Sequence, residues 1–532
     1  MDFDAIVIGS GFGGAVSACR LAEAGYRVLV LERGRRWAAK ADPRKDATPY
    51  PREPNDPWWW SQLAPERWNG WLDLRVFRTM AVAQGAAVGG GSLIYANISA
   101  VPDKSIFETG WPPEITWNAL APHYATVGKI MAVRPIPKTQ WPKRMRMMRD
   151  AAQAIGAGAR FKELDLAVSF DPEWTYDKPN AVHAASSRRF VNDHGVEQGY
   201  CVHLGECDIG CPADAKNTLD RNYLALAERK GADIRPLHLV SAIAPMPGGY
   251  SVAFDRLDNG RKVQGSASAR VVVSAAGSLG STELLLHCRD VWGTLPQIGD
   301  FLGRNWSSNG DFLTPAFYKD RKLKPWEGPT ISSAIDFLDR SRSGQSFWIQ
   351  DGGFPHLFAN WLQTGRSPNP QVQAFLIFVA AAIRKHGPLK NVMPWFAQGI
   401  DAGNGTLRLR RRWTFFGQRD LTLDWKIADS RKAIDAIVAM HKELSKATEG
   451  VALVPPSWEV FHYLITPHPL GGCNMGTTPA NGVVDHKGEV FGYRNLFVLD
   501  GAIVPEAVGV NPSRTIAALA ERATALIVEE GR

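Results

Sequence analysis

A histidine held between two prolines has the surroundings in this sequence that most directly suggest chemistry. His468 lies between Pro467 and Pro469 and is followed by Leu-Gly-Gly-Cys. Because proline fixes its own φ and restricts the residue before it, this segment cannot continue a helix or an inner strand, and its backbone is nearly fixed. An imidazole with an ordinary pKa near ~6.5 can take a proton from an alcohol at neutral pH. The motif alone leaves catalysis and an ordinary loop histidine equally open.

A second polar residue precedes the last helix that the sequence predicts. Apolar side chains recur at helical spacing over residues 513–528, and Asn511-Pro512 comes directly before them. Asn is favoured as the N-cap of a helix and Pro as its first residue, so we expect Asn511 to cap this helix and Pro512 to begin it. The amino end of the helix would stabilise an anion in front of it. A helix that only closes a sheet would show the same apolar pattern.

The amino terminus has the pattern of a dinucleotide-binding unit. Residues 4–8 form an apolar, β-branched run, the glycine-rich stretch 9–14 follows, and residues 15–24 have helical composition. A second buried strand is predicted over 27–31, with Glu32 at its carboxyl end. Strand, glycine turn, helix, strand and acid therefore occur in the order that a dinucleotide site requires.

The glycines of this unit have separate expected roles. Gly9 permits the turn, Gly11 lets the backbone approach a pyrophosphate, and Gly14 allows close packing of the helix, whose amino end offers N–H groups to the phosphates. Glu32 would accept hydrogen bonds from an adenosine ribose. An acid at this position argues against NADP, whereas the motif alone does not separate NAD from FAD.

The rest of the chain predicts a return to the same sheet and a second domain. Apolar runs predict further strands over 232–242, 251–254, 270–276 and 495–499. Residues 306–455 contain many aromatic side chains and alternating segments, which predict a β-rich second domain. The stretch 38–75 is rich in Pro, Arg and Trp, and its tryptophans could line a substrate entrance, touch a membrane surface or, as is more common, be buried in a small separate core.

The length and charge of the chain exclude some classes of protein. The chain has 532 residues, which excludes one small binding module, and a net charge of +8. Its basic residues are scattered, with Arg410–Arg412 as the densest cluster, so we expect no nucleic-acid partner. No run approaches the ~20 apolar residues that cross a bilayer, and the start lacks the features of a secretion signal. We therefore expect a cytoplasmic protein.

The six cysteines are too few for a disulfide framework in a chain of this length. Cys201, Cys207 and Cys211 invite a metal or iron–sulfur interpretation, with His203 available as a fourth ligand. Their spacing matches no common zinc or ferredoxin pattern. We expect free thiols or one local disulfide, and no metal.

Five motif blocks together resemble the glucose-methanol-choline (GMC) oxidoreductase family, and most of all its cholesterol oxidase-like branch. The blocks are the amino-terminal glycine motif, Gly-Gly-Gly-Ser at 89–92 with Asn97, His-Pro-Leu-Gly-Gly-Cys, Asp500-Gly501, and Val-Gly-Val-Asn-Pro-Ser at 508–513. They occur in order over nearly the whole chain, while residues 306–455 contribute little. The resemblance implies the α/β fold class. The protein would be a two-domain α+β flavoprotein, with a Rossmann-like FAD-binding domain and a β-rich substrate-binding domain.

The resemblance also implies non-covalently bound FAD and residues that hold it. The adenosine and pyrophosphate would be surrounded by Gly9, Gly11, Phe12, Gly13, Gly14, Glu32 and Arg33. The flavin would lie along Gly89, Gly90, Ser92, Asn97 and Ile98. Val240 would lie near the adenine, Asp500 and Gly501 would hold the ribityl and pyrophosphate portion, and Asn511 and Pro512 would face the isoalloxazine.

The implied reaction is oxidation of the hydroxyl group of a bulky, largely apolar, sterol-like alcohol to a carbonyl. His468 would accept or orient the hydroxyl hydrogen, the carbinol hydride would pass to flavin N5, and Asn511 would donate a hydrogen bond. Oxygen or a quinone would re-oxidise the flavin. The carboxylate base with which cholesterol oxidases isomerise their product has no position that we can align here, so an isomerase step is not predicted.

The sequence also predicts how the chain divides into domains. The FAD-binding domain would comprise residues 1–115, 200–305 and 456–532, and the substrate-binding domain 116–199 and 306–455. Beyond substrate and electron acceptor, peripheral membrane contact is the further partner considered, and the oligomeric state stays open. Two alternatives are a pyridine-nucleotide-dependent flavin reductase, which needs a second dinucleotide motif that the sequence lacks, and a non-catalytic binding protein with the flavoprotein fold.

Overall fold

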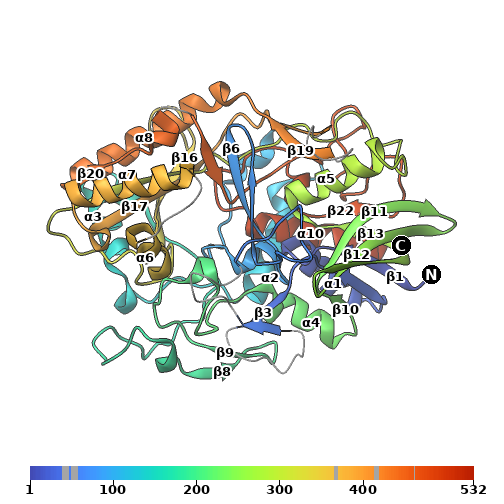
Figure 1. Ribbon diagram of the computed structural model, residues 1–532, viewed down its shortest axis with the longest axis horizontal. Helices are drawn as coiled ribbons and strands as arrows, with labels where there is room; N and C mark the ends of the chain where they lie inside the picture. The colour runs from blue at the N-terminus through green and yellow to red at the C-terminus, as the bar shows by residue number, and fades with distance from the viewer. Residues whose placement is uncertain (39–46, 50–57, 365–369, 412–418, 460–461) are drawn as a thin grey trace.

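The computed structural model describes all residues except 39–46, 50–57, 365–369, 412–418 and 460–461. A mostly parallel sheet lies at the centre of one half of the molecule. Strand β1 (Phe3–Ile8), helix α1 (Phe12–Glu23) and strand β2 (Val28–Leu31) follow one another as the sequence predicts. All four residues of β2 and the last four of β1 are buried. These β-branched strands therefore form the centre of the core, to the right in Figure 1.

Segments distant in the sequence complete this sheet. Its order is β10-β2-β1-β13-β12-β11, with β22 also paired to β13. The added strands are β10 (Asp233–Arg235), β11 (His238–Met246), β12 (Gly249–Asp258), β13 (Arg261–Ser274) and β22 (Leu496–Val498). Pairing is parallel among β10, β2, β1, β13 and β22, so the carboxyl ends of these strands meet at one edge, where a parallel sheet binds its ligand.

One predicted strand of this sheet is wrong in its extent. The run 232–242 forms two strands, β10 and β11, separated by Pro236 and Leu237. Proline has no N–H to donate, and Leu237 adopts a positive φ of 59°, so the ladder cannot continue through them.

Helices pack beside this sheet. Helix α10 (Ser513–Glu529) packs against α1 and α2 (Trp117–Ile130), while α4 (Tyr223–Arg229) packs on α1.

A second sheet, antiparallel throughout, lies in the other half of the molecule (Figure 1). Its order is β20 (Val451–Ala452), β14 (Phe312–Phe317), β17 (Val392–Gly399), β16 (Phe347–Asp351), β15 (Ser333–Phe337) and β7 (Phe161–Glu163). Helices α3 (Lys143–Ala154) and α8 (Ile427–Ala447) pack against it. The two-domain α/β class is confirmed, although residues 306–455 also contain α6 (His356–Thr364), α7 (Pro370–His386) and α8, which the alternating pattern did not predict.

A three-stranded sheet lies between these halves and positions the histidine segment. Strand β6 (Met80–Gly85) pairs with β5 (Leu72–Val76) on one side and, in parallel, with β21 (Leu464–Thr466) on the other. His468 follows β21 by two residues. The other strands and α-helices of the described residues are β3 (Arg36–Ala38), β4 (Ala47–Pro49), β8 (Arg189–Val191), β9 (Glu197–Gly199), β18 (Thr406–Arg411), β19 (Arg419–Asp424), α5 (Gly277–Asp290) and α9 (Pro456–Glu459).

The tryptophans of residues 38–75 and the cysteines can now be placed in the structure. The Trp-rich stretch is divided: Trp60 and Trp71 are buried, whereas Trp59 and Trp68 are about half exposed, at 51% and 56%. All six cysteines are free thiols. In the described part of the chain, no His, Cys, Asp and Glu side chains gather as a metal site would need, and no helix is long and apolar enough to cross a bilayer.

Candidate functional site

A cavity of about 660 Å³ opens at the carboxyl edge of the parallel sheet and extends to the second sheet. The predicted residues on its wall are Gly9, Gly11, Phe12, Gly13, Glu32, Arg33, Gly90, Ile98, Val240, His468, Asp500, Gly501, Asn511 and Pro512. The structure therefore brings residues from both ends of the chain to one continuous wall.

Four predicted residues, Gly14, Gly89, Ser92 and Asn97, do not line this cavity. Gly14 packs against the turn, since a Cβ on it would lie 2.0 Å from the Gly9 carbonyl oxygen. Ser92 supports the backbone: its hydroxyl donates to the Gly89 carbonyl oxygen at 2.7 Å. Asn97 is fully buried with a positive φ of 67°, and neither polar atom of its amide has a hydrogen-bond partner among the described residues. Their predicted contact with the cofactor stays a prediction.

The glycines of the amino-terminal loop serve packing and ligand approach separately. A Cβ on Gly13 would lie 1.5 Å from the Leu499 carbonyl oxygen, so helix α1 touches the chain leaving β22. A Cβ on Gly11 would meet no protein atom within 4 Å, because Gly11 faces the cavity. A Cβ on Gly91, in the second glycine cluster, would likewise meet no protein atom within 4 Å. Backbone that faces open space next to a helix amino end suits the close approach of a pyrophosphate.

Two buried carboxylates mark strand ends at this edge. Glu32 accepts hydrogen bonds from the Ser10 amide at 3.0 Å, the Ser10 hydroxyl at 2.7 Å and the Gly34 amide at 2.8 Å. Burial raises the pKa of Glu32, and these donors partly oppose the shift. Asp500 accepts from the amides of Gly277 and Ala502 at 2.8 and 2.7 Å, and burial raises its pKa to about 6.

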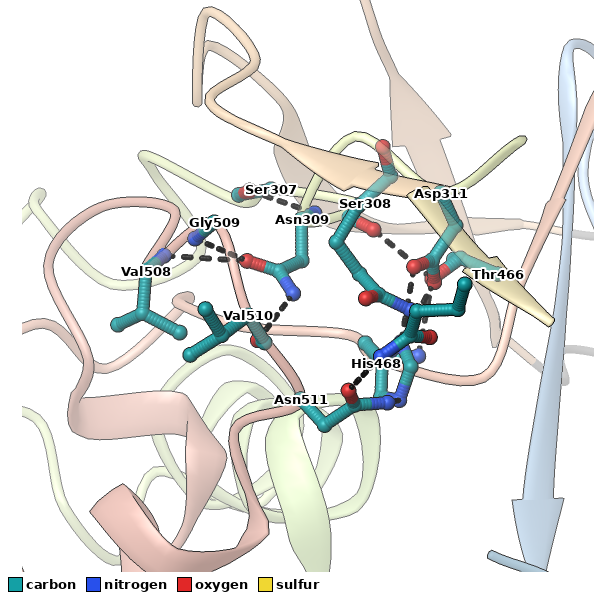
Figure 2. Close-up of polar contacts among 12 residues, drawn as sticks. Ser307, Ser308, Asn309, Asp311, Thr466, His468, Val508, Gly509, Val510 and Asn511 are labelled. Atoms are coloured by element: carbon teal, nitrogen blue, oxygen red, sulfur yellow. Dashed lines mark hydrogen bonds and ion pairs between the residues drawn. The ribbon is translucent and has the colours of Figure 1, made fainter. Parts of the chain in front are cut away.

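His468 is held by a buried carboxylate on one side and faces Asn511 on the other, as Figure 2 shows. Its Nδ1 lies 2.8 and 2.9 Å from the two carboxyl oxygens of Asp311, whose side chain has no exposed surface. Its backbone amide donates to the Thr466 hydroxyl at 2.9 Å, and that hydroxyl also contacts Asp311. Burial raises the pKa of Asp311, while His468, Thr466 and Gln398 lower it in part. The imidazole is therefore fixed, as the flanking prolines predict.

Asn511 does not cap the last helix, so that prediction was wrong. Helix α10 begins at Ser513 after Pro512, without a side-chain cap. The Asn511 oxygen instead accepts from the Gln350 amide at 2.8 Å, and Asn511 Nδ2 lies 3.3 Å from His468 Nε2. The oxygen that would have capped the helix is therefore bonded to Gln350, and the NH₂ group faces His468.

Asn309 shapes the loop that carries Asn511 (Figure 2). Its side-chain oxygen accepts from the amides of Val508 and Gly509, each at 3.0 Å, and its Nδ2 donates to the Val510 carbonyl oxygen at 2.8 Å. One buried side chain therefore satisfies three backbone groups directly before Asn511.

The sequence-based reasoning missed Asn309, Asp311 and Gln350. The sequence signal was the polar run Ser307-Ser308-Asn309-Gly310-Asp311 before a strand. Its side chains are buried, which the sequence does not show, so the run looked like an ordinary polar loop. Asp208 was not predicted either, because a single acid beside Cys207 has no local pattern that marks it as part of a site. Asp208 lines the cavity, and burial raises its pKa to about 6 although Lys216, Thr330 and Arg144 lower it.

The cavity fits a dinucleotide cofactor that carries a ring system toward His468. Gly11 faces open space beside the amino end of α1, Glu32 lies on the wall at the end of β2, and the wall also contains Gly90, Ile98, His468 and Asn511. The unpartnered amide of Asn97 is buried in the same segment. These residues would hold the cofactor that the family implies.

Comparison with known proteins agrees with this geometry. The family model described as GMC oxidoreductase matches residues 403–520, and that of an NAD(P)-binding Rossmann-like domain matches residues 7–55. A cholesterol oxidase of Acinetobacter baumannii is 31% identical over 553 residues, covering 99% of this chain and 94% of the relative. A long-chain-alcohol oxidase of Arabidopsis thaliana is 26% identical, covering 99% of this chain and 67% of its own length.

A solved structure shares the fold. An FAD-dependent oxidoreductase from Chaetomium thermophilum, 16% identical, superposes with a TM-score of 0.63 over 100% of both chains. At this identity the likeness concerns the fold alone, whereas the full-length similarity to the Acinetobacter relative establishes kinship. The chain belongs to the GMC oxidoreductase family, whose members are FAD-dependent enzymes that act on alcohols.

Proposed function

We propose that this enzyme oxidises the hydroxyl group of a bulky, largely apolar alcohol of the sterol type to a carbonyl, with His468 as base and Asn511 as hydrogen-bond donor. The observation that carries the proposal is that His468 and Asn511 lie on the wall that also contains the dinucleotide loop at Gly9–Gly13. FAD bound there supplies a hydride acceptor at flavin N5. Its binding is non-covalent in this proposal.

His468 and Asn511 would have different roles at the substrate hydroxyl. Asp311 occupies Nδ1 of His468, so Nε2 is the nitrogen directed toward Asn511 and the cavity. Nε2 would take the hydroxyl proton as the carbinol carbon loses its hydride. The Asn511 amide group would donate to the substrate oxygen and hold it in place. Asp311 would stabilise the positive charge that the imidazole then gains.

A bulky apolar substrate suits the side chains at the substrate end. The cavity wall includes Phe396, whose ring centre lies 6.4 Å from that of His468, and the apolar side chains of Ile94, Leu313 and Ile331. Apolar area removed from water stabilises binding by roughly 25 cal/mol per Å², so a large ring system gains more from this wall than a short alcohol does. The cholesterol oxidase and long-chain-alcohol oxidase relatives support a large apolar substrate.

Such substrates reside in lipid, and one exposed surface could meet it. Leu74, Val76 and Ile465 are exposed by 38%, 69% and 61% on the three-stranded sheet beside the cavity. Val76 and Ile465 are both paired with Ala81, so they lie in one row on one face. We include peripheral membrane contact through this face in the proposal. Replacing Val76 and Ile465 by Asp should reduce sedimentation with lipid vesicles, and unchanged sedimentation would remove this part.

The test is turnover of an alcohol panel under air and without oxygen. We expect kcat/KM to rise from short alcohols to long-chain alcohols and sterols, with hydrogen peroxide as product if oxygen is the acceptor and quinone reduction if it is not. Preference for short polar alcohols would contradict the substrate class. Bleaching of the flavin by NADH but not by alcohols would favour a flavin reductase, and a colourless protein unable to take up FAD would favour a binding protein.

A further inference from the structure

We propose that Asp311 and Gln350 are positioning residues that set the tautomer of His468 through a directed chain of hydrogen bonds. The chain runs from the Gln350 amide to Asn511, from Asn511 to His468 Nε2, and from His468 Nδ1 to Asp311. This inference rests on the proposed function, because it assigns the proton and the lone pair to the two nitrogens of the catalytic imidazole.

Asp311 decides the direction of the chain at one end. Both of its oxygens lie within 2.9 Å of Nδ1, and it is buried against the Thr466 hydroxyl, a further donor. A buried carboxylate accepts hydrogen bonds and does not donate them. The proton of a neutral His468 therefore belongs on Nδ1, which leaves the lone pair on Nε2.

Gln350 supports the same direction at the other end. It lies on β16, has no exposed surface, and donates from Nε2 to the Asn511 oxygen at 2.8 Å. The Asn511 amide is thereby turned so that its NH₂ group faces His468 Nε2. If the amides of Gln350 and Asn511 were reversed, Asn511 would present an oxygen to Nε2, which would need a proton there and leave the Nδ1 lone pair against the carboxylate.

Two substitutions change the direction without changing the shape. In Asp311→Asn, the new amide can donate to Nδ1, so the neutral imidazole can carry its proton on Nε2 and lose its basic atom on the cavity side. In Gln350→Glu, the carboxylate would accept from the Asn511 NH₂ group and turn the Asn511 oxygen to Nε2. His468 would then lie between two acceptors and favour the doubly protonated form.

The matched control is Asp401→Asn. Asp401 is also buried and accepts from Ser307 and Ser308, which lie four and three positions before Asp311 in the same polar run. It has no hydrogen bond to His468 among the described residues. The same change of carboxylate to amide is thus made next to the site without touching the imidazole.

The experiment is ¹⁵N NMR of the histidine-labelled, FAD-loaded oxidised enzyme at neutral pH, with the His468 signal identified by its loss in His468→Gln. We expect Nδ1–H in the wild type and in Asp401→Asn, Nε2–H in Asp311→Asn, and a doubly protonated ring in Gln350→Glu. Nε2–H in the wild type would overturn the proposal. So would Nδ1–H retained in both a folded Asp311→Asn and Gln350→Glu.

Steady-state kinetics separate this inference from the proposed function. We expect kcat with the best alcohol to fall about 10²–10⁴-fold in Asp311→Asn, with little change in KM or in flavin absorbance. If no alcohol reduces the flavin, the proposed function fails, although the tautomer can still be read by NMR. If alcohols are oxidised but the tautomer does not follow Asp311 and Gln350, only this inference fails.

Discussion

Asn309 donates a hydrogen bond of 2.8 Å to the carbonyl oxygen of Val510, the residue directly before Asn511. Its side-chain oxygen also accepts hydrogen bonds from the amides of Val508 and Gly509. Asn309, three residues before β14 of the second sheet, therefore holds the loop that carries Asn511. The position of Asn511 against His468 therefore depends on a contact between parts of the chain 201 residues apart.

Asn309→Ala is expected to lower both stability and activity. The change strands three buried backbone groups, each of which costs about 1–3 kcal/mol when it loses its partner, so we expect destabilisation of about 2–4 kcal/mol after the loop relaxes. Urea unfolding and kcat measure the two effects. Asn481→Ala is the control, because Asn481 accepts from turn amides at Thr477 and Thr478 on the exposed surface. Equal, small effects of both variants would contradict the role of Asn309.

Gly11 and Gly13 should respond differently to a Cβ atom. Gly11 has φ −69°, which Ala adopts freely, and faces open space, so Gly11→Ala should leave the melting temperature of the apoprotein unchanged while weakening FAD binding at least tenfold, about 1.4 kcal/mol. Gly13→Ala drives a Cβ into the Leu499 carbonyl and should impair folding itself. FAD titration and thermal unfolding of both variants check this. Wild-type FAD affinity in Gly11→Ala would show that the cofactor lies elsewhere.

Asp208 should make substrate binding depend on pH. Burial raises its pKa to about 6, so the carboxyl is neutral below that pH and charged above it. An apolar substrate that enters the cavity removes water from the charged form, which costs free energy. We expect KM for an apolar alcohol to rise as pH increases through 6, and Asp208→Asn to have a lower KM at pH 8 without this rise. An identical pH dependence of KM in both proteins would count against it.

Two buried histidines should weaken the fold in acid. Burial lowers the pKa values of His203 and His441 to about 3, below the value near ~6.5 of an unfolded chain. Between these values the unfolded state binds more protons, so stability is complete above about pH 6.5 and falls with decreasing pH, by up to about 1.4 kcal/mol per pH unit for each histidine.

Urea unfolding at pH 7.5 and 5.5 measures this slope. His441→Asn should reduce it, since Asn can keep the contact with the Thr314 hydroxyl but does not titrate. His183→Asn, at an exposed histidine, should leave it unchanged. A slope that both variants share with the wild type would rule out the buried histidine as its source.

Local patterns predicted the dinucleotide half well because its determinants are contiguous. The residues from Gly9 to Gly14 and Glu32 act through a turn, a helix end and a strand end, all visible within 32 residues. The rigidity of His468 likewise follows from adjacent prolines. Its meeting with Asn511 was predicted by family resemblance alone.

Long-range contacts limited the rest. Asp311 and Gln350 lie 157 and 161 residues from the groups they hold, and no local pattern distinguishes them from solvated polar residues. The Asn511 cap failed for the same reason: a distant side chain took the oxygen that local rules assign to the helix. Helices α6 to α8 were missed because alternating segments elsewhere in 306–455 dominated the interpretation.

Anaerobic flavin reduction in wild type and His468→Gln tests the central claim most directly. Both proteins are loaded with FAD and mixed with the best alcohol, and bleaching of the flavin is followed, with dithionite as a reductant that needs no base. We predict a rate of reduction by alcohol at least about 10²-fold slower in His468→Gln, with dithionite reducing both proteins equally. Reduction by alcohol at the wild-type rate in His468→Gln would contradict the account.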